Sequence, residues 1–351
     1  MPEKNKDPDY QLIPTIPAVE NGPVPKPREK HAACAFGNQL AIYGGVDAHG
    51  RPVDDDATIW LLNPEEKTWS ALRSSMGADG KTLQSSTSSK LFANGDELIL
   101  YTSASTSLWR FNTKTITWFP LPTPPVPASP TNAALLDNHI YLITSSDPLS
   151  SQLHILPLHT PTPGGKDKNE GEGQKWTTLT FPTNPLAPGP LARHAGALLP
   201  ITTGYGRNYL TYLLGARDKP TSSAHNTSTT TPNMSEQDIT ECSDSWVLQL
   251  PSSSLQPKPA WSISEAIKPA KIKDAIRHGI GAENGKWEWA EVDVKVPNNL
   301  GIGGLDEGKL HPGPRAWFGA DVMGGGDGVV FWGGEDAEGE RCGDGWVVRF
   351  E

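Results

Sequence analysis

Arginine, histidine and carboxylate side chains recur at turn positions of this 351-residue chain, and these residue types can bind ligands. The candidate ligand-binding residues are Arg28, His31, Arg193, His194, Arg217, Arg315 and Asp336. Guanidinium groups bind anionic groups through paired hydrogen bonds, so the arginines could hold an anionic part of a small molecule. Alternatively, the arginines and histidines only hydrogen-bond neighbouring loop backbone. Arg217 could also pair with Asp218 beside it, and a surface ion pair contributes only about 0–1 kcal/mol.

These residues flank short apolar segments that predict β-strands. The first complete unit starts at Pro27, and its later apolar segments include Leu40–Gly45, Ile59–Leu61 and Trp69–Leu72. Turn residues such as Gly37-Asn38 separate the segments, as expected for strands joined by tight connections. The unit therefore predicts a meander of four antiparallel strands.

The same unit recurs along the chain, and its last strand is the clearest marker. A tryptophan stands three residues before an aliphatic residue in Trp69-Ser-Ala-Leu72, Trp118-Phe-Pro-Leu121, Trp176-Thr-Thr-Leu179 and Trp289-Ala-Glu-Val292. Repeated four-stranded units bury their faces by stacking radially, as in a β-propeller. We expect an all-β fold, a five-bladed propeller within a single domain over residues 1–351. The expected blades span about 24–72, 84–121, 128–180, 188–293 and 312–351 together with 9–17.

The fifth unit stops before a fourth strand of this type. Its segments are Val329–Gly334 and Trp346–Val348, after which the sequence given ends at Glu351. Near the N-terminus, Tyr10-Gln11-Leu12-Ile13 has the same aromatic-x-x-aliphatic spacing. We therefore expect the N-terminal strand to close the last blade.

Two segments have the composition of flexible insertions. Residues 160–174 are rich in Pro, Gly, Lys and Glu, and residues 221–241 are rich in Ser, Thr and Asn. Such segments bury little apolar surface, so we expect them to form loops between strands.

The antiparallel meander decides which candidate residues can meet. The loop before the first strand of a blade and the loop after its second strand emerge on the same face. All seven candidates lie in such loops, so we expect them around one mouth of the central channel. Binding groups are often carried by loops on a rigid scaffold.

The repeat resembles the kelch family of β-propellers over nearly the whole chain. The resemblance rests on strands that end in a glycine pair, on the acidic loops that follow them and on the regularly spaced tryptophans. The pair is intact at Gly44-Gly45 and Gly333-Gly334, whereas Thr102-Ser103, Thr144-Ser145 and Leu214-Gly215 stand at the other positions.

Within this family, the fourth and fifth repeats look like the nitrile-specifier group of plants and its fungal relatives. The similar residues are Gly215-Ala216-Arg217-Asp218, Ser243-Asp244-Ser245-Trp246 and Gly333-Gly334-Glu335-Asp336. In the plant group a Glu-x-x-x-Asp-x-x-x-His run holds ferrous iron, which helps convert unstable thioglucosidase products into nitriles. The resemblance therefore implies an Fe(II) site.

The iron motif is altered in this sequence. Ala216 stands where the resemblance calls for glutamate, and His225 follows Asp218 by seven residues rather than four. Asp218 and His225 remain the candidate ligands, with Glu335 or Asp336 as a replacement from the next blade. Carboxylate and imidazole ligands with open positions suit iron.

The composition of the chain bears on its partners and on its location. A net charge of −10 argues against nucleic acid, whose binding depends on clustered Lys and Arg. No stretch approaches the roughly 20 apolar residues of a membrane span, and the N-terminus lacks a signal-peptide pattern, so we expect a cytoplasmic monomer. The three cysteines, Cys34, Cys242 and Cys342, are widely spaced and are expected to be reduced.

Two functional hypotheses fit the sequence. The first is a binding or interaction module that takes a protein or a small anionic ligand at one mouth of the channel, without a cofactor. The alternative is a specifier-like lyase or isomerase, with or without Fe(II). Fold analogy alone does not establish such chemistry.

Overall fold

The computed structural model of the protein divides the chain into two compact units, Met1–Pro130 and Thr131–Glu351. The residues it describes are 16–28, 30–53, 58–74, 83, 88–103, 107–144, 150–158, 174–182, 189–203, 207–218, 239–250, 287–292, 312–323 and 328–349. The expected insertions fall almost wholly outside these ranges. Only Gln174 of the first is described, and Ile239–Glu241 of the second forms strand β17.

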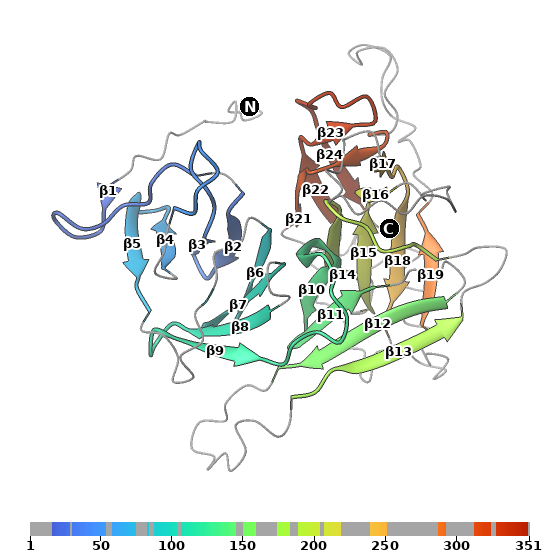
Figure 1. The fold of residues 1–351 in the computed structure, drawn as a ribbon, viewed down its shortest axis with the longest axis horizontal. Coiled ribbons are helices and arrows are strands. Elements are labelled where there is room, and N and C mark those ends of the chain that lie inside the picture. Colours follow the sequence, from blue (N-terminus) through green and yellow to red (C-terminus); the bar gives the residue numbers. More distant parts are fainter. Residues whose placement is uncertain are drawn as a thin grey trace, which may run out of the picture. The chain divides into compact units, whose positions relative to one another are not determined.

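The first unit contains two β-meanders (Figure 1). The first sheet has the strand order β1-β5-β4-β3-β2. Its strands are β1 (Ile16–Pro17), β2 (Ala32–Phe36), β3 (Gln39–Tyr43), β4 (Ile59–Asn63) and β5 (Thr68–Leu72). The second sheet has the order β6-β7-β8-β9, with strands β6 (Ser89–Asn94), β7 (Glu97–Thr102), β8 (Ser107–Asn112) and β9 (Thr117–Leu121).

The tryptophans of the repeat help to join the two sheets of the first unit. The Trp118 ring lies edge-on to Tyr43 of the neighbouring sheet, with ring centroids 5.8 Å apart, and 4.8 Å from Phe111. Every residue of β7 is buried, because a central strand of a stacked sheet is covered on both faces. Stacking therefore buries the apolar segments that the sequence places in each unit.

The second unit contains three further meanders. The first two are four-stranded sheets with the orders β10-β11-β12-β13 and β14-β15-β18-β19. Their strands are β10 (Ala133–Leu136), β11 (His139–Ile143), β12 (Ser150–Pro157), β13 (Thr177–Pro182), β14 (Ala197–Thr203), β15 (Arg207–Leu213), β18 (Ser245–Gln249) and β19 (Glu288–Glu291). The third is a three-stranded sheet of β21 (Gly319–Val322), β22 (Gly328–Trp332) and β24 (Gly345–Arg349).

Short elements accompany these sheets. A 3-10 helix, η1, covers Pro130–Asn132. Two two-stranded ladders pair β16 (Ala216–Asp218) with β17 (Ile239–Glu241), and β20 (Arg315–Ala316) with β23 (Glu335–Asp336). β16 follows the second strand of the fourth blade, whereas β20 precedes the first strand of the fifth blade and β23 follows its second strand. The two ladders therefore fix the conformation of loops that carry candidate residues.

The first strands of neighbouring sheets pack together: β2 contacts β6, β10 contacts β14, and β14 contacts β21. This is the arrangement of propeller blades, whose innermost strands are neighbours. The predicted all-β, five-bladed propeller is therefore confirmed, with two blades in the first unit and three in the second. Within the described residues the fifth blade has three strands, as the sequence predicts.

The N-terminal strand differs from the expectation in its described part. Ile16 and Pro17 pair in parallel with Thr68 and Trp69 of β5, in the first blade. The pairing is possible because β5 has an open outer edge, where the Ala18 amide donates to the Trp69 carbonyl at 2.7 Å. The segment Tyr10–Ile13 lies outside the described residues, and its role in the last blade remains a prediction.

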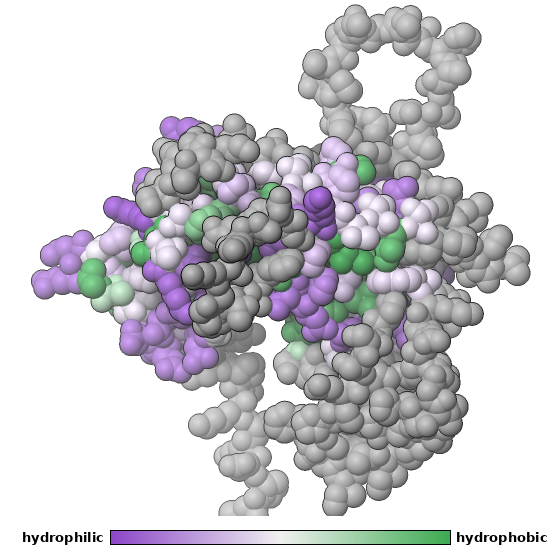
Figure 2. All heavy atoms as spheres, turned by 90° about the horizontal axis from the view of Figure 1, so that it is seen from below, coloured by the Kyte–Doolittle hydropathy of each residue, from purple (hydrophilic) through white to green (hydrophobic). Residues whose placement is uncertain are grey.

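Part of the apolar surface is exposed, and Figure 2 shows apolar patches between hydrophilic residues on one face of the molecule. In the second unit, exposed large apolar residues include Trp317, Val330, Trp332 and Val347. Among the described residues, no helix is long and apolar enough to cross a membrane.

Candidate functional site

Three of the predicted arginines have the same role in three blades. The Nη1 atom of each arginine donates a hydrogen bond to the backbone carbonyl of the first residue of a glycine-pair position. The bonds are Arg28 to Gly44 at 3.0 Å, Arg193 to Leu214 at 2.8 Å and Arg315 to Gly333 at 3.1 Å. The loop before the first strand is thereby tied to the end of the second strand.

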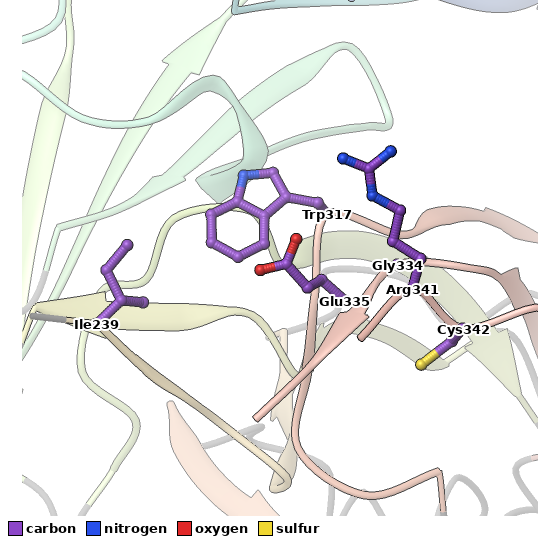
Figure 3. Close-up of a pocket in the computed structure, with 6 residues that line it drawn as sticks. All are labelled: Ile239, Trp317, Gly334, Glu335, Arg341 and Cys342. Atoms are coloured by element: carbon purple, nitrogen blue, oxygen red, sulfur yellow. The ribbon is translucent and has the colours of Figure 1, made fainter. Parts of the chain in front are cut away.

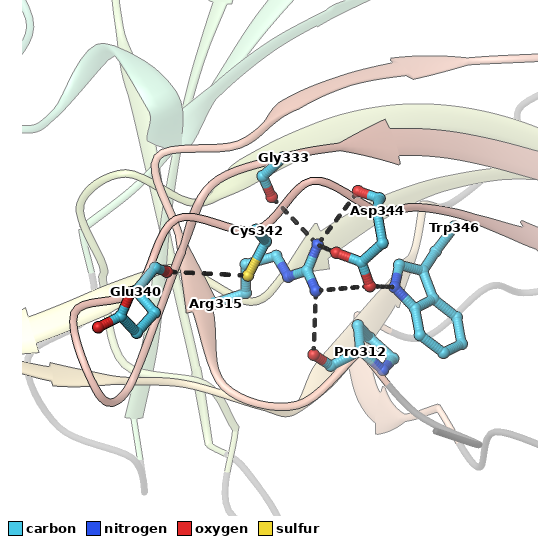
Figure 4. A network of polar contacts seen from close by, with 7 residues as sticks. All are labelled: Pro312, Arg315, Gly333, Glu340, Cys342, Asp344 and Trp346. Carbon is cyan, nitrogen blue, oxygen red and sulfur yellow. Dashed lines mark hydrogen bonds and ion pairs between the residues drawn. The ribbon is translucent and has the colours of Figure 1, made fainter. Parts of the chain in front are cut away.

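Arg193 and Arg315 also pair with an aspartate that precedes the third strand. Arg193 is 4% exposed and Arg315 is 0% exposed. Nη2 of Arg193 lies 2.5 Å from Asp244, and Nη1 of Arg315 lies 2.8 Å from Asp344. Figure 4 shows the Arg315 guanidinium enclosed by Asp344 and by backbone carbonyls. These guanidinium groups are therefore engaged within the protein rather than offered to a ligand.

The same aspartates hold the tryptophans of the third strands. Asp344 accepts a hydrogen bond from the indole of Trp346 at 3.0 Å, and Asp244 accepts one from Trp246 at 2.5 Å. Hydrogen bonding by Arg315 lowers the pKa of the Asp344 carboxyl below its usual value. Burial acts to raise the pKa of Asp244, but the charge of Arg193 and the Trp246 hydrogen bond outweigh it, so this pKa is also lowered.

Three of the five glycine-pair positions share one backbone conformation, including the fourth, where the sequence departs from Gly-Gly. Their φ angles are 65° and 99° at Gly44 and Gly45, 45° and 94° at Leu214 and Gly215, and 70° and 99° at Gly333 and Gly334. At Gly334 a Cβ atom would lie 2.5 Å from the Ala316 carbonyl oxygen, so only glycine fits. The fourth repeat thus keeps the turn found at Gly44-Gly45 and Gly333-Gly334 although its first glycine is replaced by leucine.

Backbone conformation also aligns the segments that contain the histidines. The residue two positions after each arginine is left-handed, with φ of 57° at Lys30, 53° at Ala195 and 55° at Trp317. His31 follows this position, whereas His194 precedes it. The two histidines therefore occupy different positions of the repeat when the three segments are aligned on the left-handed residue.

The two histidines consequently have different surroundings. His31 is exposed in the first unit, where desolvation by nearby atoms and the charge of Arg28 lower its pKa. His194 forms a backbone bridge with Ala216, with N–H···O distances of 2.9 and 2.8 Å. Its ring lies 6.2 Å from the ring of Trp317.

The acidic candidate Asp336 shapes its own hairpin. Its Oδ1 accepts hydrogen bonds from the amides of Glu338 at 3.1 Å and Glu340 at 2.9 Å. Asp47 makes the equivalent turn in the first blade, accepting from the amides of His49 and Arg51. Asp336 therefore supports the loop that carries Glu335.

Arg217 occupies the corresponding position in the fourth blade. The bridges His194–Ala216 and Ala316–Glu335 are equivalent, so Arg217 in β16 corresponds to Asp336 in β23. By the same alignment Glu335 stands in the fifth blade where Ala216 stands in the fourth. The side chain of Arg217 is half-buried.

A pocket of about 530 Å³ lies in the second unit beside these ladders (Figure 3). Its lining residues are Ile239, Trp317, Gly334, Glu335, Arg341 and Cys342. Trp317 is 50% exposed, and Figure 3 shows the Glu335 carboxylate pointing toward its ring. The Arg341 guanidinium points away from Glu335 in the same view. The pocket thus combines an accessible aromatic face with a carboxylate.

Of the candidate iron ligands, Glu335 and its alternative Asp336 have described side chains. Asp218 lies in β16, but its side chain is outside the described part, as is the whole of His225. Among the residues that the structure describes, no three His, Cys, Asp or Glu side chains form a metal-binding group. Glu335 lines the pocket, whereas the Asp336 carboxylate accepts hydrogen bonds within its own hairpin. The iron prediction stays a prediction.

The class defined by this fold is the β-propeller. No family model matches the sequence, and no curated protein matches it. Among solved structures, the chain is similar to the one titled "Structure of YjhT", with a TM-score of 0.50 and 13% identity. The match covers 93% of this chain and 82% of that one. At this identity the likeness is one of fold.

Sequence reasoning missed the pocket and the buried ion pairs. Trp317 and Arg341 line the pocket, while Asp244 and Asp344 hold the buried arginines. A signal for the aspartates was present, because Cys242-x-Asp244-x-Trp246 and Cys342-x-Asp344-x-Trp346 are the same motif. The repeated motif also places Cys342, which lines the pocket, in register with Cys242.

Proposed function

We propose that this propeller is a binding module that uses the surface around Trp317 in the second unit. The observation that carries the proposal is an indole that is 50% exposed on a residue whose φ is 55°. A bulky residue in this left-handed region costs about 1–2 kcal/mol, and such strain persists where the surrounding structure imposes it. Exposed tryptophans on rigid supports are typical of the few residues that dominate binding energy.

The support beneath Trp317 is rigid. Arg315, two residues earlier, is buried and bonded to Asp344, and the Trp317 amide donates to the Ala195 carbonyl at 2.9 Å. The backbone that carries the ring is therefore fixed before any ligand arrives, which reduces the entropy lost on binding. A preorganised aromatic surface supports recognition of a partner, whereas Arg193 and Arg315 serve the scaffold.

We also propose that the blades are kelch repeats. The φ angles shared by three of the five glycine-pair positions support this assignment, as do the equivalent hairpins at Asp47 and Asp336. Recurrence of one local conformation at matched positions is the mark of a repeat architecture.

The test of the binding function is quantitative affinity purification from an extract of the native cells, comparing wild type with Trp317→Ala. Alanine suits this backbone, because Ala195 occupies the equivalent left-handed position with φ of 53°. The matched control is Trp332→Ala, which removes a 63% exposed indole outside the pocket. Loss of the same partners in Trp317→Ala only would support the proposal, and identical partner sets in all three proteins would refute it.

A further inference from the structure

We infer that the Trp317 pocket receives a cationic side chain, lysine or arginine, from a basic segment of a protein partner. This inference rests on the proposed function and specifies the chemistry of its ligand. The juxtaposition behind it is the exposed Trp317 ring with the Glu335 carboxylate pointing toward it (Figure 3).

An indole face attracts a cation, and tryptophan is the strongest of the aromatic side chains in this respect. The Glu335 carboxylate lines the same pocket, so a cation over the ring would also meet a negative charge. Within the described residues neither Glu335 nor Arg341 has a side-chain hydrogen bond or ion pair. Glu335 is therefore available to a ligand without breaking an internal contact.

The local charge favours the same ligand class. The hairpin of residues 335–341, with sequence Glu-Asp-Ala-Glu-Gly-Glu-Arg, contains four carboxylates and one guanidinium. Arg341 is exposed, and its guanidinium points away from Glu335. The whole chain has a net charge of −10, so its field also draws basic partners and repels acidic ones.

The rest of the pocket suits the methylene stem of a long basic side chain. Ile239 of β17 forms an apolar wall, and the Gly334 backbone lies on another side. Lysine and arginine bury their stems along apolar surface while the charged head group meets polar partners. A partner with several such residues gains further attraction from the acidic hairpin.

The experiment uses the full chain and two dye-labelled peptides, (Arg-Ser-Gly)₄ and (Glu-Ser-Gly)₄, with binding followed by fluorescence polarisation. Wild type should bind the basic peptide more tightly than the acidic one. Trp317→Ala and Glu335→Gln should each weaken the basic peptide about fivefold, the effect of losing one cation–π contact or one close charge. Equal thermal unfolding midpoints of wild type and Glu335→Gln would establish that the fold is intact.

The matched control is Glu338→Gln, which removes the same charge from an exposed side chain on the same hairpin that does not line the pocket. It should change the affinity less than twofold. Equal losses in Glu335→Gln and Glu338→Gln would overturn the inference, because they would indicate general attraction to an acidic surface.

Two other outcomes separate the inference from the proposed function. Tighter binding of the acidic peptide, lost in Trp317→Ala, would overturn the cationic ligand and leave the binding surface in place. Binding of both peptides that is unchanged in Trp317→Ala would overturn the inference, and the proposed function would fall with it if the captured partners were also unchanged.

Discussion

Replacement of Arg315 by methionine tests whether the predicted arginines serve the scaffold. Arg315 is 0% exposed, and its guanidinium donates to Gly333 and Pro312 and pairs with Asp344 at 2.8 Å. Removing one partner of a buried charged pair costs about 3–5 kcal/mol. Because the Asp344 side chain is 40% exposed and can regain water, we expect a loss near the lower end, about 3 kcal/mol.

The assay is urea unfolding followed by tryptophan fluorescence. Because the chain has two compact units, it can unfold in more than one transition. The free energy of unfolding is therefore taken from the transition whose midpoint differs between wild type and Arg315→Met. The control is Arg341→Met in the same blade, an exposed arginine whose loss should change stability by less than about 0.5 kcal/mol. Equal stability of the two variants would refute the structural role of Arg315.

A double-mutant cycle sharpens this test. Asp344→Asn removes the carboxylate charge while keeping the approximate shape of the side chain. If Arg315 and Asp344 stabilise the fold as a pair, the sum of the unfolding free energies lost in the two single variants should exceed the loss in the double variant by about 0.5–3 kcal/mol. Additive losses would mean that the 2.8 Å contact carries no coupling energy.

Two further predictions concern protonation and metal. Burial lowers the pKa of His154, which lies between Thr144 and Thr178, so the unfolded chain binds more protons than the folded one as the pH falls below about 6.5. The unfolding free energy of wild type should therefore decrease between about pH 7.5 and pH 5.5, and more steeply than that of His154→Gln; parallel profiles in chemical denaturation would contradict this. The iron hypothesis predicts about one bound metal per chain after anaerobic loading with Fe(II), and its loss in Asp218→Ala; metal analysis that finds wild type without iron would count against it.

The fold could be predicted from the sequence because the patterns that indicate its strands and turns are local. A tryptophan three residues before an aliphatic residue marks the fourth strand of a blade, and β5, β9, β13 and β19 form at these positions. Turn residues bound the strands, so their limits follow from short-range chemistry. The described N-terminal pairing could not be deduced in this way, because several blades offer an outer edge to the same short segment.

The candidate site was harder to predict from the sequence, because it depends on contacts between residues that are distant in the chain. The arginines were found, but the distance in sequence from each arginine to its carbonyl partner is 16, 21 or 18 residues. The unequal lengths of the loops hide this equivalence in the sequence. Exposure of Trp317 could not be predicted, because a tryptophan in a repeat is usually part of the core.

Leu214 has a consequence for how this repeat can change by mutation. Its φ is 45°, a glycine-like conformation, yet its side chain is 1% exposed and packs in the cluster that contains Phe331. Glycine would relieve the backbone but leave a cavity, and loss of a buried leucine side chain costs about 2–5 kcal/mol. The effect of glycine at this position therefore depends on its neighbours: a stable Leu214→Gly variant requires a second substitution that fills the space, so the fourth repeat holds the conformation without the Gly-Gly signature.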